Sequence, residues 1–279
     1  MTVASQLMHK PITILKQSTV SDVIKKLLDN SISRLIVQDS GKAIGIISEK
    51  DVGFFLFNET TKQGLDQVPL EKIMNRIEYI DENKSAESCA KQMMERKISS
   101  LTVGSADKAL GIFTKTDLVK HYAENHSGKH KISDYMTHDF VSTHSAAPLS
   151  KVVKKLLEYK VSRLIIKNQA ENPIGVISFR DLFRISLDLG SNVDDTGFTI
   201  SEKIRRGFLS EDGFGGVSLA HDVMTKGIIS IKFNEDIAGA CSTMLQNKVS
   251  GLAVIDGNEG LAGIISKTDV TRALASMAS

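Results

Sequence analysis

One short pattern occurs four times along this chain and limits its possible folds more than any other feature. The pattern is Gly, two apolar residues, Ser or Thr, any two residues, and Asp. Its copies span residues 45–51, 111–117, 175–181 and 263–269. A motif that returns with matching neighbours at a near-constant interval indicates copies of one supersecondary unit. The sequence therefore predicts four structural repeats.

Two further landmarks precede every copy of the motif. A Ser that opens a short apolar run lies 12 or 13 residues before the motif Gly, at Ser33, Ser99, Ser162 and Ser250. A Met lies a further 25 or 26 residues upstream, at Met8, Met74, Met136 and Met224. Because the landmarks keep their spacing in all four copies, each repeat is expected to extend from the Met to beyond the motif Asp.

The pattern within one repeat predicts its secondary structure. A β-like run follows the Met, as at residues 12–15, and apolar residues at helical spacing follow at Val20, Val23, Ile24, Leu27 and Leu28. Two apolar, β-branched-rich runs then flank a turn at residues 39–41, which is typical of a hairpin. A second helix is expected after the motif Asp. Each repeat is thus predicted to be β-α-β-β-α and about 55 residues long.

Odd and even copies differ in a consistent way. Copies two and four share Lys-Thr-Asp at the motif end, whereas copies one and three share an Arg after the strand-opening Ser, at Arg34 and Arg163. The duplicated unit is therefore predicted to be a pair of repeats. The first pair is expected at 1–128, with repeats at about 8–57 and 72–124. The second is expected at 129–279, with repeats at about 134–188 and 222–279 and an insertion at about 189–221.

These repeats resemble the CBS domain, named after cystathionine β-synthase, which works in pairs called Bateman modules. The resemblance covers most of the chain and implies two tandem pairs with no attached effector domain. It also implies the α+β fold class, with the two repeats of a pair packed through their sheets about a pseudo-twofold axis. Clefts between such repeats commonly bind AMP, ADP, ATP or S-adenosylmethionine, so the resemblance implies an adenosine-containing ligand.

The motif offers two of the groups that a nucleotide needs. It brings a Ser or Thr to a helix start, where free backbone N–H groups favour an anion, and a carboxylate that can accept hydrogen bonds from ribose hydroxyls. In the CBS family these two positions contact ribose and phosphate, which implies Ser48, Asp51, Thr114, Asp117, Ser178, Asp181, Ser266 and Asp269 as ligand-binding residues. The same spacing also matches a helix-capping box that needs no ligand, and the motif alone leaves both interpretations open.

Cations near the motif are further candidates for binding phosphate. One group precedes the second strand of three repeats, at a turn that resembles the one where the γ subunit of AMP-activated kinase presents basic residues to phosphate. Its members are Arg96, Lys97, Lys160 and Lys248, whereas the first copy has Asn30 and Ser31. The others open a strand, at Arg34 and Arg163, or lie three residues after the motif Asp, at Lys120, Arg184 and Arg272. Solvated surface cations remain the alternative for each.

Composition excludes several other classes of protein. The 279-residue chain has 35 Lys and Arg against 33 Asp and Glu, a net charge of +2, which argues against a nucleic-acid partner. No apolar run is long enough to span a bilayer, so no membrane partner is expected. The N-terminus has no secretion signal, and the two cysteines fit the reducing cytoplasm. Both cysteines align with core positions of other copies and are predicted to be buried.

Five of the seven histidines lie between residues 121 and 144: His121, His126, His130, His138 and His144. They spread over a link that contains Gly and Ser, whereas a metal site needs convergent ligands. We therefore interpret them as part of a solvated linker and predict no metal site.

The combined prediction is a regulatory sensor rather than an enzyme, because the repeats leave no room for a separate catalytic domain and no catalytic set of residues stands outside them. We expect AMP, ADP or ATP as the regulatory ligand, with or without Mg²⁺, and no catalytic cofactor. Ligand binding is expected to change the packing of the repeats and so to signal to a protein partner or within a homo-oligomer. The alternatives are a ligand-free scaffold, or a sensor of S-adenosylmethionine or NAD.

Overall fold

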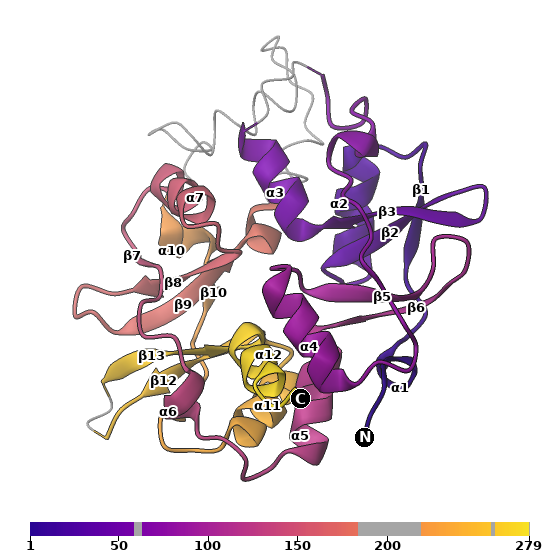
Figure 1. Cartoon of the computed structure of the whole chain (residues 1–279). Helices are drawn as coiled ribbons and strands as arrows, with labels where there is room; N and C mark the ends of the chain where they lie inside the picture. The colour runs from indigo at the N-terminus through magenta and orange to yellow at the C-terminus, as the bar shows by residue number, and fades with distance from the viewer. Residues whose placement is uncertain (59–62, 184–218, 258–259, 279) are drawn as a thin grey trace, which may run out of the picture. The chain divides into compact units, whose positions relative to one another are not determined.

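The first repeat shows how the local sequence builds one unit of the fold (Figure 1). The computed structural model describes residues 1–58, 63–183, 219–257 and 260–278. Strand β1 (Thr13–Leu15) runs parallel to β2 (Arg34–Asp39), which pairs antiparallel with β3 (Lys42–Ser48). Helix α2 (Val20–Asp29) connects the two parallel strands, and α3 (Glu49–Asn58) follows the hairpin. The predicted β-α-β-β-α order is confirmed in this repeat.

Helix α2 forms where the sequence supplies both a start signal and an apolar face. Thr19 caps its N-terminus by accepting a hydrogen bond from the Asp22 backbone N–H, and Asp22 accepts in return from the Thr19 N–H at 2.9 Å. Val20, Val23, Ile24 and Leu27 are fully buried on the face toward the core. Burial of an apolar stripe provides most of the stability of a helix this short.

The other three repeats have the same element order. The second contains β4 (Tyr79–Ile80), α4 (Ala86–Glu95), β5 (Ser100–Gly104), β6 (Ala109–Thr114) and α5 (Lys115–Asn125). The third contains β7 (Ser142–His144), α7 (Leu149–Glu158), β8 (Arg163–Lys167), β9 (Pro173–Ser178) and helical residues 179–183. The fourth contains β11 (Ser230–Lys232), α11 (Ile237–Gln246), β12 (Gly251–Ile255), β13 (Leu261–Ser266) and α12 (Lys267–Ala275). The predicted α+β fold class is confirmed. Of the insertion predicted at about 189–221, residues 189–218 lie outside the described residues.

The hairpin between the second and third strands has a shared irregularity in all four repeats. In each hairpin, the register of the two antiparallel strands shifts directly after the residue that pairs with the motif Gly. In the first repeat that residue is Val37, which pairs with Gly45. In the first repeat, Ser40 and Gly41 form a two-residue turn with φ of 49° and 79°, the left-handed values that suit a tight hairpin. The turn predicted from residues 39–41 is therefore confirmed.

A short lead segment before each repeat pairs with the third strand of a neighbouring repeat. Three of the four lead segments begin with a single turn of α-helix and one with a 3₁₀ turn: α1 (Ala4–Leu7), η1 (Leu70–Lys72), α6 (Ile132–Tyr135) and α10 (Ala220–Val223). The residue after each landmark Met makes the pairing: His9 with Ile112, Asn75 with Ile46, Thr137 with Ile264, and Thr225 of β10 (Thr225–Lys226) with Val176. Repeats one and two thus exchange lead segments, as do repeats three and four. The domain boundaries at 128 and 129 stay a prediction.

The lead segments also explain why a Met landmark and a motif Gly occur together in the repeats. A Cβ on Gly111 would lie 2.8 Å from Met8 Sδ, and one on Gly175 would lie 2.8 Å from Met224 Sδ. A Cβ on Gly45 would overlap the side chain of Met74. The motif Gly therefore provides the space that the Met of the exchanged lead segment fills.

At the motif Gly of repeat four, Gly263, the nearest neighbour is backbone, and a Cβ would lie 2.7 Å from the Thr137 carbonyl oxygen. We expect Gly263→Ala to lower the free energy of unfolding by about 1–3 kcal/mol, because a backbone atom cannot move aside as a flexible side chain can. Chemical denaturation measures the change. The matched control is Gly239→Ala in α11 of the same repeat, where a Cβ meets nothing within 4 Å. It should raise stability by up to about 1 kcal/mol. Equal effects of the two variants would contradict this account.

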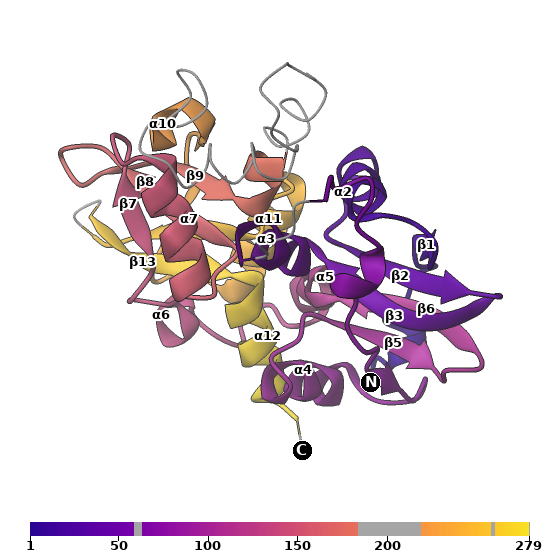
Figure 2. The ribbon, with the colours of Figure 1, turned by 90° about the horizontal axis from the view of Figure 1, so that it is seen from above.

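The chain divides into two units that each combine alternate repeats. Unit 1 comprises Met1–Pro11, Ile77–Phe140 and Ile228–Ser279, and therefore repeats two and four. Unit 2 comprises Ile12–Arg76 and Val141–Gly227, and therefore repeats one and three. In unit 1, α12 packs on α4 and α5, and α11 packs on α5 (Figures 1 and 2). Copies that are alike in sequence thus lie in the same unit.

Each unit has its own apolar core. In unit 2 the core joins α2 and α3 to α7 and helical residues 179–183, and in unit 1 it joins the helices of repeats two and four. Cys89 and Cys241 are fully buried in unit 1, and burial raises the pKa of each thiol to about 12. The prediction that both cysteines fill the core is confirmed. No helix within the described ranges has the length and apolar character to cross a bilayer.

Candidate functional site

The motif Ser or Thr and the motif Asp meet at a corner between strand and helix in every repeat. In the third repeat the Ser178 backbone N–H and hydroxyl donate to Asp181 Oδ2, at 2.8 and 2.7 Å. The same two hydrogen bonds join the three other pairs: Ser48–Asp51, Thr114–Asp117 and Ser266–Asp269. Local capping therefore occupies one carboxylate oxygen in all four repeats.

The second carboxylate oxygen faces the exchanged lead segment in two repeats. Asp269 Oδ1 accepts a hydrogen bond from Thr137 Oγ1 at 3.0 Å, and Asp181 Oδ1 accepts from Thr225 Oγ1 at 3.2 Å. Both threonines directly follow a landmark Met. Sequence reasoning missed this role. The signal was visible, because a side chain that can form hydrogen bonds follows every landmark Met: His after the first, Asn after the second and Thr after the other two.

At the corner of repeat two the lead-segment residue is His9, which follows Met8 and whose Nε2 lies 3.6 Å from Asp117 Oδ2. Burial raises the pKa of Asp117, but hydrogen bonds from His9 and Thr114 outweigh it and hold the pKa below its ordinary value. The carboxylate is therefore ionised at neutral pH and can only accept hydrogen bonds. At the corner of repeat one the equivalent lead-segment residue, Asn75, instead donates its amide to the Ile73 carbonyl at 3.5 Å.

The four corners differ in how many donors surround the carboxylate. Asp269 is 2% exposed and also accepts from Arg272 Nη2 at 2.8 Å, while the same nitrogen donates to the Tyr135 carbonyl. Among the described residues, Asp51 accepts hydrogen bonds only from Ser48. Arg272, predicted to bind phosphate, thus holds the motif carboxylate and a lead segment in place.

Two of the predicted cations lie beside the motif. Arg34 pairs with Ser48 across the hairpin, and Arg163 pairs with Ser178 in the same way. Burial lowers the pKa of Arg163, with Glu49 and Asp181 opposing the shift and Arg180 adding to it. Both arginines are partly buried. The structure therefore brings an arginine next to the capped Ser–Asp pair in the odd repeats, and the phosphate-binding role of these arginines stays a prediction.

The predicted helix-end cations have a local structural explanation. Lys97, Lys160 and Lys248 adopt left-handed φ values of 55°, 52° and 54°, and Ser31 matches them at 52°. Each follows the C-cap residue of its repeat's first helix, and the next N–H bonds back to the helix, as Ile98 does to the Met93 carbonyl at 3.0 Å. The three lysines are exposed, and a cation there also favours the helix dipole.

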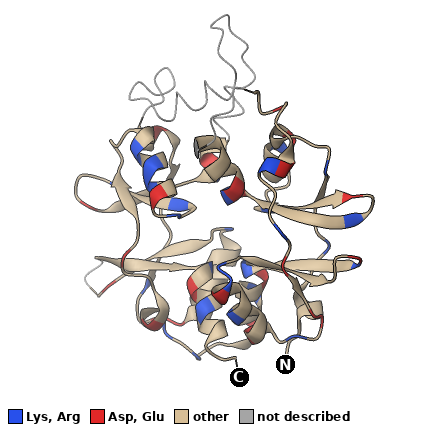
Figure 3. Cartoon of the chain, turned by 45° about the horizontal axis from the view of Figure 1, so that its top comes forward, with Lys and Arg blue, Asp and Glu red and all other residues tan. Residues whose placement is uncertain are grey.

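Arg96, which caps α4 in the position before Lys97, is exposed as well, and Arg184 lies outside the described residues. Lys and Arg are interspersed with Asp and Glu in the elements drawn in Figure 3, as the small net charge implies. The phosphate-binding role of the helix-end cations stays a prediction.

The two variable motif positions join repeats within each unit. In unit 1, Lys115 Nζ donates to Thr268 Oγ1 at 3.0 Å, and Lys267 Nζ donates to Thr116 Oγ1 at 2.8 Å. In unit 2, the Arg180 guanidinium pairs with Glu49 Oε1 at 2.6 Å. Sequence reasoning assigned these residues no contact, although the shared Lys-Thr of copies two and four was the signal for it.

The histidines are not all in a solvated linker. His121 is 5% exposed within α5, so the linker interpretation is wrong for this residue. The His121 ring can be buried because both of its nitrogens have a polar partner, His126 and Asn125. Burial, followed by the nearby His126, lowers the pKa of His121, and burial also lowers the pKa of His126 although Glu87 opposes that shift.

The model of the CBS domain matches four segments of the chain, at residues 4–56, 70–124, 132–188 and 220–276. The chain belongs to the CBS-domain family. These segments include all four Ser/Thr–Asp corners, so the predicted repeats are confirmed.

Full-length similarity extends to archaeal proteins. The chain is 21% identical over 278 residues to the uncharacterized protein MJ1225 of Methanocaldococcus jannaschii, covering 94% of this chain and 95% of that protein. The crystal structure of MJ1225 has a TM-score of 0.80 over 98% of this chain and 100% of that chain, at 19% identity. An uncharacterized conserved protein from Pyrococcus horikoshii has a TM-score of 0.64 over 98% of this chain and all of its own, at 20% identity. These likenesses establish the fold.

A smaller relative has been solved with a ligand. The CBS domain protein PAE2072 from Pyrobaculum aerophilum, complexed with AMP, is 20% identical and covers 42% of this chain and 90% of its own, with a TM-score of 0.37. AMP is thus a ligand of that CBS protein.

Proposed function

We propose that this CBS protein is a regulatory sensor that binds an adenine nucleotide at its Ser/Thr–Asp corners. The observation that carries the proposal is the open corner of repeat one, where Ser48 occupies Asp51 Oδ2 and no described residue donates to Oδ1. A carboxylate oxygen at a helix start can accept a hydrogen bond from a ribose hydroxyl. The adjoining helix N–H groups and Arg34, opposite Ser48, supply positive charge for a phosphate.

Repeat three offers a similar corner, and repeat four does not. Arg163 lies opposite Ser178, and a ribose hydroxyl could replace the single 3.2 Å contact of Thr225 with Asp181. At Asp269 a ligand would have to displace both Thr137 and Arg272 from a buried carboxylate. We therefore assign ligand binding to the odd repeats first and a structural role to the Asp269 corner. Under that assignment, the corner of repeat four acts as a ligand-free scaffold, while the odd repeats bind the nucleotide.

The arginines favour a phosphorylated ligand over S-adenosylmethionine. A guanidinium can grip phosphate with two parallel hydrogen bonds, whereas the sulfonium of S-adenosylmethionine is itself a cation. A ligand that binds one arrangement of the repeats better than another shifts the population toward it by the difference in affinity. We propose that consecutive repeats form the responding pairs, at 1–128 and 129–279, and that a protein partner or a second copy reads the shift.

A ligand panel tests this function. We expect the melting temperature to rise with AMP, ADP or ATP, because a ligand at 100 times its dissociation constant adds about 2.7 kcal/mol of stability. S-adenosylmethionine and NAD serve as comparison ligands in the same thermal-shift assay, with and without Mg²⁺. If only S-adenosylmethionine or only NAD raises the melting temperature, that compound is the ligand in place of AMP, ADP or ATP. No shift with any of the five would leave the scaffold as the function.

A further inference from the structure

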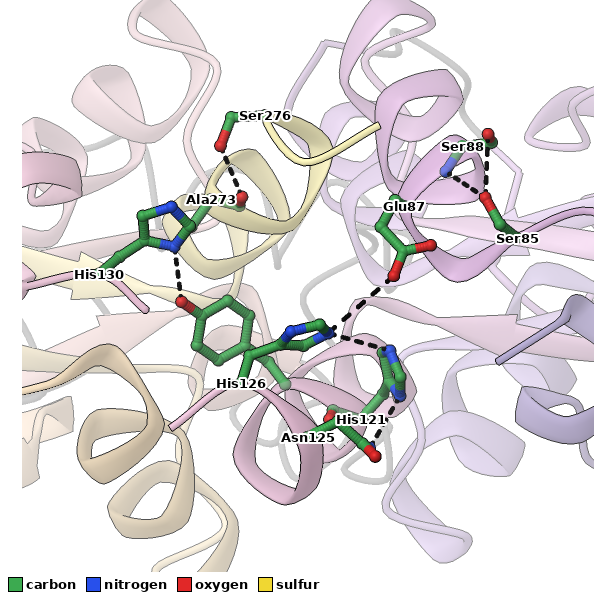
Figure 4. Close-up of polar contacts among 10 residues, drawn as sticks. Ser85, Glu87, Ser88, His121, Asn125, His126, His130, Ala273 and Ser276 are labelled. Carbon is green, nitrogen blue, oxygen red and sulfur yellow. Dashed lines mark hydrogen bonds and ion pairs between the residues drawn. The ribbon is translucent and has the colours of Figure 1, made fainter. Parts of the chain in front are cut away.

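Three side chains of types that can ligate a metal converge in repeat two, where the start of α4 meets the end of α5 (Figure 4). Glu87 lies in the first turn of α4, His121 lies near the end of α5, and His126 caps that helix. His126 Nε2 is 3.3 Å from His121 Nε2 and 4.0 Å from Glu87 Oε1. The three donor atoms all lie within 4.8 Å of one another, and all belong to unit 1.

The cluster is held by ordered elements and is largely shielded from water. His121 is 5% exposed, and the side chains of His126 and Glu87 are 15% and 17% exposed. The His126 backbone N–H donates to the Tyr122 carbonyl at 3.0 Å, which fixes the residue at the helix end. Ser85 caps α4 by accepting from the Ser88 N–H at 3.1 Å, which sets the first turn that carries Glu87. Ligands placed on rigid elements are positioned more closely than ligands on loops.

We propose that Glu87, His121 and His126 form a binding site for a divalent transition metal, with Zn²⁺ as the reference ion. Two nitrogens bound to a tetrahedral Zn²⁺ at about 2.0–2.1 Å lie ~3.3 Å apart. The two Nε2 atoms already have that separation. To complete a face of the tetrahedron, Glu87 Oε1 must approach the two imidazole nitrogens by at most about 1.5 Å, because it lies 4.0 Å from His126 Nε2 and the donor atoms are all within 4.8 Å of one another. A side-chain rotation achieves this movement.

The donor set selects the class of metal. Two imidazole nitrogens and one carboxylate oxygen suit Zn²⁺, Co²⁺ or Ni²⁺, whereas Ca²⁺ and Mg²⁺ prefer oxygen ligands alone. Three protein ligands leave a fourth position for water. The side chains of Glu87 and His126 are each partly exposed, so water can reach the cluster. The alternative is a metal-free hydrogen bond between the two imidazoles, which the 3.3 Å separation also permits.

Asn125 supports His121 from the other side of the ring. Its amide nitrogen lies 3.1 Å from His121 Nδ1 and 2.9 Å from the His121 carbonyl. Metal binding at Nε2 leaves the ring proton on Nδ1, which then needs an acceptor. The Asn125 amide oxygen supplies that acceptor when the side chain rotates. A bound metal would therefore tie the beginning of α4 to the end of α5, the helices on which α11 and α12 of repeat four pack.

Titration of chelator-treated full-length protein with Zn²⁺, followed by calorimetry, tests the site, and Co²⁺ absorption in the visible range reports tetrahedral geometry. Glu87→Gln and His126→Gln each remove one ligand at a partly exposed position and keep a similar size. His138→Gln is the matched control, since His138 is an exposed histidine of the same unit outside the cluster. We expect one Zn²⁺ per wild-type chain, and an affinity that falls at least ~10-fold in both ligand variants but is unchanged in the control.

Circular dichroism of the metal-free variants verifies that they are folded. Because the two ligand variants change different helices, a folding defect in one leaves the other as the test. Absence of stoichiometric Zn²⁺ binding to the wild type would overturn the proposal in favour of the metal-free imidazole pair. So would an equal affinity of the wild type and both ligand variants, or an equal loss in His138→Gln.

Discussion

Replacing Phe179 with Ala is expected to lower the free energy of unfolding by about 3–5 kcal/mol, the range for a fully buried aromatic side chain. Phe179 is 1% exposed and packs on three other rings in the core of unit 2. Its ring stacks on Phe183 at 6.3 Å and on Phe57 at 6.4 Å between centroids, and it is tilted against Phe54 at 6.1 Å. The residue occupies a variable position of the motif, so only the structure reveals its role. Equilibrium unfolding in urea measures the loss.

The matched control for Phe179→Ala is Lys267→Ala, at the same motif position of repeat four. Lys267 donates a hydrogen bond to Thr116 and is not part of an apolar core. Losing one such hydrogen bond should cost no more than about 1.5 kcal/mol. If the two variants lose the same stability, the motif position acts through the helix start that they share, and the aromatic cluster does not hold unit 2 together.

Replacing Asp269 with Ala is expected to destabilise the ligand-free protein by about 2 kcal/mol or more, whereas Asp51→Ala should cost about 1 kcal/mol. Both variants lose the helix cap. Asp269→Ala also leaves Thr137 and Arg272 without their shared acceptor at a buried site. Urea unfolding of the two variants, side by side in the absence of nucleotide, measures this difference.

Nucleotide affinity should change in the opposite order. Asp51→Ala removes the open carboxylate oxygen proposed to accept from ribose, and is expected to weaken AMP binding at least ~10-fold, the equivalent of one or two hydrogen bonds to a charged group. Asp269→Ala should leave the affinity of the odd repeats nearly unchanged once the folded fraction is taken into account. An unaltered affinity in Asp51→Ala would remove that residue from the ligand site and leave it as a helix cap.

Local features of the fold were predictable because they depend on neighbours in the sequence. The apolar spacing of α2, the tight turn at Ser40 and Gly41, and the capping box at each motif Asp all follow from residues within one turn of helix or one hairpin. The fourfold repetition multiplied each of these signals. The α+β class and the order of elements were therefore accessible without a structure.

Contacts between distant segments were not predictable in the same way. The exchange that places Met8 against Gly111 joins residues far apart in the chain, and a single sequence does not say which copy supplies the partner. The odd copies resemble each other in sequence, as do the even copies, and this similarity matches the division into units. The sequence analysis interpreted it only as the duplication of a pair. Arg272 has the charge of a phosphate ligand, and only its contacts with Asp269 and Tyr135 show its structural role.

The histidine cluster shows the same limit at a candidate site. His121 and His126 have the spacing of two histidines with four residues between them that occurs in zinc sites, but the third donor comes from another helix, which the sequence does not indicate. Burial of His121 depends on the packing of α5 against α4 and the helices of repeat four. No pattern within the segment 121–144 contains that information.

Equilibrium dialysis of the wild-type protein against AMP is the most direct test of the central claim, that the Ser/Thr–Asp corners hold an adenine nucleotide. We predict saturable binding with a whole-number stoichiometry of one or two per chain, reduced in Asp51→Ala and competed by ATP. Dialysis with no saturable uptake of AMP, ADP or ATP at millimolar concentration would contradict the claim, and the four corners would then be helix caps alone.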